Sequence, residues 1–115
     1  MIRVARDEDW PAIVEVHRRA FVDDPMVPGL VEELRRGGYS VPRLAFVAVA
    51  DDRVVGNVMS SWVSLAESER RFLQLSPIGV LPEYQRRGFG GALVRATLEG
   101  ARALGEPLVF VEGNP

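Results

Sequence analysis

The chain has 115 residues, of which 47% are hydrophobic and 26% charged, and its formal net charge is −2. This length supports a single domain over residues 1–115, and the charge gives no general attraction to nucleic acid or to an acidic membrane surface. All 14 basic residues are arginine and cysteine is absent, which excludes Schiff-base lysines, lysine-dependent phosphate loops, thiol nucleophiles, thiolate metal sites and disulfides.

The hydropathy pattern argues against a membrane protein. The longest apolar run, residues 44–50, is far shorter than the roughly 20 residues that a membrane-spanning helix needs. Residues 1–4 lack the apolar stretch of a secretory signal. We therefore expect a cytoplasmic protein.

In the first part of the chain the pattern alternates between extended and helical. Residues 2–4 predict a short strand, and Asp7 is a candidate cap for a helix with an apolar stripe of Trp10, Ile13, His17, Ala20 and Phe21. His17 is the only histidine, and its place in this stripe predicts a packing residue at the edge of the core, with no catalytic role. A second helix is predicted over residues 28–36, because two glycines follow it as a stop.

The rest of the chain predicts more strands and one long helix. The expected strands cover residues 44–50, 54–65, 72–80 and 108–111, and the helix covers residues 90–104. Pro77 lies inside the third of these strands and cannot donate a backbone hydrogen bond, so it predicts a bulge or an unpaired edge there. The fold class is therefore α/β with a mixed sheet.

A glycine-rich turn precedes the long helix, with the sequence Gln85-Arg86-Arg87-Gly88-Phe89-Gly90-Gly91. Its glycines allow positive φ angles and a close approach of the backbone to a ligand, and the free amides of the first helical turn favour an anion. The two arginines add positive charge. The turn therefore predicts a phosphate-binding site.

Two common phosphate-binding motifs do not fit this turn. A Walker loop requires a lysine, which the chain lacks. A dinucleotide fingerprint requires a third glycine where Leu93 stands, and it normally follows the first strand of its unit.

Residues 85–90 fit the pattern Gln/Arg-x-x-Gly-x-Gly/Ala, with Val80-Leu81-Pro82 in front of them. This segment resembles the acetyl-CoA-binding motif of the GCN5-related N-acetyltransferase (GNAT) family, and the predicted order of elements is also that of the family. The resemblance implies the GNAT acyl-CoA N-acyltransferase fold, acetyl-CoA as cosubstrate, and direct attack on its thioester by a primary amine of a small molecule or peptide. It implies no metal.

The resemblance also implies which residues contact the cosubstrate. The backbone of residues 78–80 would pair with the pantetheine arm, and the amide of Val80 or a neighbour would act as the oxyanion donor. The pyrophosphate would lie on the amides of residues 86–92. The cofactor-binding set is therefore Ile78, Gly79, Val80, Gln85, Arg86, Arg87, Gly88, Phe89, Gly90, Gly91 and Ala92.

The proton transfers of such a reaction have several candidate groups. Carboxylates near strand ends and one hydroxyl on the fourth strand could act through water, namely Glu67, Glu83, Glu112 and Ser76. We retain Glu112 and Ser76 as catalytic candidates. Trp62 either lines the substrate pocket or packs as an ordinary residue of the sheet, and Asn114 is a candidate for holding the cosubstrate.

Many members of the family place a tyrosine acid on a helix after the fifth strand and then add two strands. This sequence ends before that helix, and neither Tyr39 nor Tyr84 matches the tyrosine's position, so the resemblance implies a C-terminally incomplete domain. The open sheet edge predicts that the chain belongs to a longer one or that two copies pair or swap elements as a homodimer. A non-catalytic acyl-CoA-binding module, or an unrelated nucleotide-binding α/β protein using the same turn, stays open as an alternative function.

Overall fold

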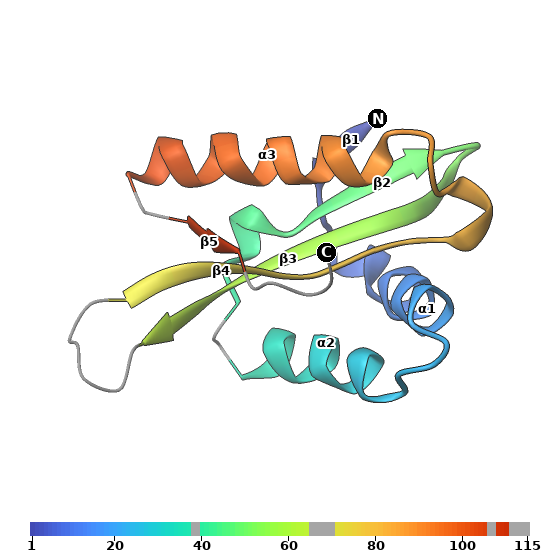
Figure 1. The fold of residues 1–115 in the computed structure, drawn as a ribbon, viewed down its shortest axis with the longest axis horizontal. Coiled ribbons are helices and arrows are strands. Elements are labelled where there is room, and N and C mark those ends of the chain that lie inside the picture. Colours follow the sequence, from blue (N-terminus) through green and yellow to red (C-terminus); the bar gives the residue numbers. More distant parts are fainter. Residues whose placement is uncertain (38–39, 65–70, 106–107, 111–115) are drawn as a thin grey trace.

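The computed structural model describes residues 1–37, 40–64, 71–105 and 108–110. In chain order its main elements are β1 (Ile2–Val4), α1 (Trp10–Ala20), α2 (Met26–Arg36), β2 (Phe46–Ala50), β3 (Arg53–Ser64), β4 (Arg71–Val80), α3 (Phe89–Leu104) and β5 (Leu108–Phe110). Helix α3 covers one face of the sheet, and α1 and α2 cover the other (Figure 1). The predicted order of elements and the α/β class are confirmed.

The described strands form one sheet in the order β1-β2-β3-β4-β5. All neighbouring strands are antiparallel except β4 and β5, which are parallel. The mixed sheet expected from the sequence is therefore present. Among the described residues, no helix has the length and hydropathy that crossing a bilayer would require.

Three boundaries differ from the sequence prediction by about two residues, each for a local reason. Helix α1 begins at Trp10 after a 3-10 turn at Asp7–Asp9, and the carboxylate of Asp9, not Asp7, accepts the amide of Arg6 at 2.7 Å. Helix α2 begins two residues early, at Met26, whose amide donates to the side chain of Asp24 at 3.2 Å. Strand β2 begins late, at Phe46, because Pro42–Leu44 forms a second 3-10 turn.

A bulge in β4 confirms the irregularity predicted at Pro77. Val58 pairs with Ile78 and Ser60 pairs with Leu75, so one residue of β3 lies opposite Ser76 and Pro77 together. Leu75 and Ile78 are three residues apart, yet both contact the cluster that α3 covers. In a regular strand they would face opposite sides of the sheet.

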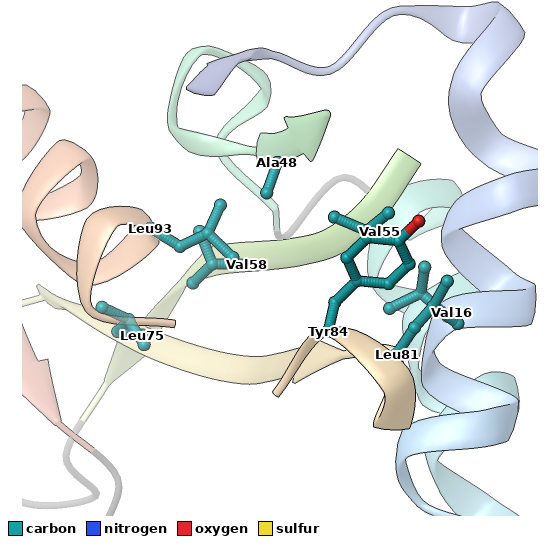
Figure 2. Close-up of a cluster of buried hydrophobic side chains, with 8 residues drawn as sticks. All are labelled: Val16, Ala48, Val55, Val58, Leu75, Leu81, Tyr84 and Leu93. Atoms are coloured by element: carbon teal, nitrogen blue, oxygen red, sulfur yellow. The ribbon is translucent and has the colours of Figure 1, made fainter. Parts of the chain in front are cut away.

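The core anchors the segment between β4 and α3. Eight buried side chains from α1, three strands, this segment and α3 form one cluster (Figure 2), namely Val16, Ala48, Val55, Val58, Leu75, Leu81, Tyr84 and Leu93. Leu81 and Tyr84 belong to the segment itself and are 1% and 8% exposed. The glycine-rich turn that follows is therefore attached to the core at its start.

Candidate functional site

The turn between β4 and α3 has the conformation that its glycines suggest. Leu81 donates its amide to Val55 at 2.8 Å, and Pro82–Tyr84 forms a 3-10 turn. Arg86 and Gly88 then take positive φ angles of 65° and 88°. A left-handed backbone at a residue other than glycine is uncommon and costs free energy, and such residues cluster at functional sites as well as in tight turns.

The first turn of α3 presents backbone donors beside this loop. The first backbone bond of the helix runs from the amide of Ala92 to the carbonyl of Gly88, at 3.0 Å. The amide of Ala92 is therefore occupied, and the available donors of the helix N-terminus lie before it, at residues 89–91. The amide of Ala92 is thus not free to donate to an anion, whereas the sequence prediction included it among the phosphate-binding amides.

Tyr84 holds the charged side of the turn in place. Its hydroxyl donates to Asp51 at 2.8 Å, and the guanidinium groups of Arg53 and Arg87 lie 5.8 and 5.2 Å from the centre of its ring. The bond to Asp51 and burial raise the pKa of Tyr84 above its usual value. Both effects work against this tyrosine as a proton donor, in keeping with its exclusion as the catalytic acid.

A groove of about 330 Å³ lies where β4, α1 and the start of α3 meet. It is lined by Ala20, Phe21, Ile78, Gly79, Val80, Gln85 and Gly90. The structure thus brings together five residues that the sequence predicted as cofactor-binding. It adds Ala20, the last residue of α1, and Phe21, which caps that helix, and the sequence marked both only as the end of a helical stripe. Larger hollows of about 430 and 460 Å³ flank α2 and contain none of the predicted residues.

Over residues 78–80, the edge of β4 away from β3 has no strand partner among the described residues, and we call it the open edge. Among the described residues β4 pairs with β5 only over residues 73–75, before the bulge. The amide of Leu81 points to β3, so alternation along the strand directs the amide of Gly79 to β3 and those of Ile78 and Val80 to the open edge. The carbonyl of Val80 lies on this edge too, where it accepts a 3.0 Å bond from the side chain of Gln85.

The remaining catalytic candidates are only partly described. Ser76 lies in the bulge and is not among the residues that line the groove. Glu83 forms an ion pair with Arg19 at 2.9 Å, and its bond to Arg19 lowers the pKa of Glu83, which weakens it as a base. Glu67, Tyr39, Glu112 and Asn114 lie outside the described residues.

Trp62 packs against the cluster of Val41, Leu44, Leu73 and Ala101 on the α3 side of the sheet. Of the two roles that the sequence allowed for Trp62, this contact supports ordinary packing in the sheet.

The prediction that His17 lies at the edge of the core is wrong. Its side chain is 0% exposed, and its Nε2 atom lies 2.8 Å from Oδ1 of Asn57 on β3. Burial lowers the pKa of His17, and the bond to Asn57 offsets this only in part. The signal available in the sequence was Asn57 itself, a polar residue inside an apolar strand that needs a buried partner.

Comparison with known proteins identifies the class to which this fold and groove belong. Residues 1–113 match the family model described as "Acetyltransferase (GNAT) domain". The chain therefore belongs to the GNAT acetyltransferase family, which confirms the resemblance found in the glycine-rich turn.

Two relatives from Escherichia coli K12 carry the name uncharacterized N-acetyltransferase. YjhQ is 33% identical over 108 residues, which cover 92% of this chain and 59% of YjhQ. YhbS is 30% identical over 116 residues, covering all of this chain and 68% of YhbS. The chain thus spans about three fifths to two thirds of the length of these relatives.

Two solved structures share the fold closely. A GNAT family acetyltransferase from Brucella melitensis, in complex with acetyl-CoA, has a TM-score of 0.89 at 29% identity, covering 100% of this chain and 76% of that one. YhbS from Escherichia coli, in complex with CoA, has a TM-score of 0.87 at 27% identity, covering 96% and 61%.

Proposed function

We propose that this protein is an N-acetyltransferase that moves an acetyl group from acetyl-CoA to a primary amine of a small molecule or peptide. The observation that carries the proposal is the open edge of β4 at residues 78–80, which faces the N-terminus of α3 across one groove. Family membership and the CoA ligands of the two solved neighbours support the same assignment.

Each part of the groove has a role in this proposal. The amides of residues 86–91 and the positive end of the α3 dipole bind the pyrophosphate, and Arg86 and Arg87 add charge. The open edge of β4 pairs with the pantetheine arm as a further strand would. Ala20 and Phe21 form the apolar wall opposite that edge.

The amide of Val80 is the proposed oxyanion donor. The amine nitrogen attacks the thioester carbon, the carbonyl oxygen gains negative charge, and the N–H of Val80 stabilises that charge. The C–S bond then breaks, the departing CoA thiolate takes a proton to become the thiol, and the nitrogen of the amide product loses one. Gln85 fixes the adjacent peptide unit, Val80–Leu81, through its bond to the carbonyl of Val80.

Binding is tested first, by thermal unfolding with acetyl-CoA. A ligand at 100 times its Kd stabilises the folded state by about 2.7 kcal/mol, which raises the Tm measurably. Gly90→Asp should weaken binding at least about fivefold, because a carboxylate near the diphosphate costs roughly 1–4 kcal/mol. A Cβ at Gly90 meets nothing within 4 Å, so the variant should fold.

Two control variants separate charge from bulk. Gly90→Asn has almost the same size without the charge and should bind better than Gly90→Asp. Gly29→Asp adds the same charge on α2, where a Cβ also meets nothing within 4 Å, and should bind as the wild type does. A wild-type protein that gains no stability from excess acetyl-CoA would refute the proposal.

Turnover is tested by thiol release from acetyl-CoA with a panel of primary amines. Release above the amine-free rate supports transfer. Tight binding with no amine-dependent release would favour the non-catalytic acyl-CoA-binding module.

We also propose that the protein is cytoplasmic and that two copies of it pair. Light scattering checks the second, since a strictly monomeric species would contradict pairing.

A further inference from the structure

His17 lies directly behind two residues of the proposed acetyl-CoA groove. Its ring stacks on Phe21, with the ring centres 6.0 Å apart and the planes inclined by 13°. It also contacts the backbone of β4, since a Cβ built on Gly79 would lie 3.0 Å from Nδ1 and 3.3 Å from Cε1 of His17. Both neighbours line the groove, whereas His17 itself is fully buried.

The hydrogen-bond network sets the tautomer of this ring. The side-chain amide of Asn57 donates to the carbonyls of Phe46 at 2.8 Å and Val58 at 3.3 Å, so its Oδ1 must be the acceptor toward His17. Nε2 of His17 therefore carries the hydrogen, and Nδ1 keeps a lone pair. Burial lowers the pKa of His17, in agreement with a neutral ring.

The lone pair of Nδ1 faces Gly79. Nδ1 is buried and has no hydrogen-bond partner among the described residues. The α-hydrogen of Gly79 that takes the place of a side chain points toward it, and such Cα–H contacts are weakly favourable. No other amino acid fits at this position without moving the ring or the strand.

We propose that His17 is a positioning residue for acetyl transfer, which fixes the backbone of residues 78–80 through its contact with Gly79. Asn57 anchors the ring to β3, and the ring sets the distance between α1 and the open half of β4. The amide of Val80, the next residue, is thereby held at the place where the oxyanion forms. The inference rests on the proposed function, because the amide matters only if acetyl transfer occurs there.

The test variants change the His17 side and the Gly79 side of this contact separately. His17→Phe keeps an aromatic ring and loses both nitrogens, and His17→Gln keeps a donor for Asn57. Gly79→Ala places a methyl group against the ring. Ile13→Ala is the control, because Ile13 is also a buried residue of α1 but packs against α2, β2 and β3 through Val31, Val47 and Met59.

Kinetics separate positioning from general stability. We expect His17→Phe and Gly79→Ala to lower kcat by about tenfold or more at saturating acetyl-CoA, because misplacement by a fraction of an ångström is costly in catalysis. The Kd for CoA should change much less. His17→Gln should recover part of kcat, and Ile13→Ala should lose stability with nearly unchanged kcat. Equal kcat values for His17→Phe and Ile13→Ala would overturn the inference.

A second readout does not need a substrate. Backbone amide NMR shifts of Ile78, Gly79 and Val80 in the free protein should move in His17→Phe and stay in place in Ile13→Ala. Unmoved shifts would overturn the inference even if the enzyme is active. A wild-type protein that fails to bind acetyl-CoA would refute the proposed function instead, and the two failures are thus distinguishable.

The double variant tests the contact directly. Gly79→Ala should cost less activity, and move the Val80 amide less, when His17 is also alanine, because the methyl group then has room. Additive effects of the two substitutions would contradict coupling through this contact.

Discussion

Acidification from pH 7 to pH 5 should destabilise the folded protein through His17. In the unfolded chain this residue has a pKa of about 6.5. In the folded protein burial lowers the pKa of His17, and the bond to Asn57 offsets this only in part. The unfolded state therefore binds the proton first as the pH falls.

The sign and size of the effect follow from proton linkage. The stabilisation that a neutral His17 contributes to the free energy of unfolding is complete above pH 6.5. It is lost as the pH falls toward the pKa of His17 in the folded state. If the buried ring stays neutral at pH 5, proton uptake by the unfolded chain lowers the free energy of unfolding by about 2 kcal/mol between pH 7 and pH 5. Charged neighbours on α1 are paired elsewhere, Arg18 with Glu15 and Arg19 with Glu83.

Urea unfolding at pH 7 and pH 5 measures this loss. His17→Phe is the reference, because it has the same carboxylates and lacks the titrating ring. The wild type should lose more than the variant over this range, by at most about 2 kcal/mol. Equal losses would refute the assignment of a neutral, buried His17.

Three further predictions concern stability. Gly100→Ala in α3 should destabilise the protein by roughly 1–3 kcal/mol, because its Cβ would lie 2.5 Å from Cδ2 of the buried Leu44. Gly29→Ala in α2 meets nothing within 4 Å and should stabilise by about 0.5–1 kcal/mol, so thermal unfolding should shift in opposite directions. Asp9→Asn should cost roughly 1–3 kcal/mol at pH 7, because the carboxylate accepts two bonds from Arg3. These bonds lower the pKa of Asp9, so the cost should shrink as the pH falls below about 4, and urea unfolding at pH 7 and pH 3 checks it.

The site could be predicted where its signals are local in the sequence. The glycine-rich turn depends on the conformations of neighbouring residues, so Gly88 and the start of α3 could be placed from the pattern alone. Pro77 likewise marked the irregular part of β4, since a missing amide donor disturbs a strand wherever it stands.

The parts that could not be predicted depend on contacts between distant segments. Phe21 reaches the groove only because α1 packs beside the open half of β4. His17 and Asn57 are 40 residues apart, and neither residue indicates its partner by spacing. The early start of α2 depends on the bond from the amide of Met26 to the side chain of Asp24. Asp23 is adjacent and has the same side chain, so the sequence does not show which aspartate accepts this bond.

At the bulge, Ser76 and Pro77 together lie opposite one residue of β3, so the groove depends on the number of residues in β4 as well as on their side chains. Deleting one of these residues would leave Leu75 and Ile78 on their present face, because the spacing between them would become two. The strand would then lose the bend and extra twist that a bulge introduces, and residues 78–80 would change position relative to α1 and the groove. One additional residue in β4 thus separates a strand that only completes a sheet from a strand whose edge is available to a bound ligand.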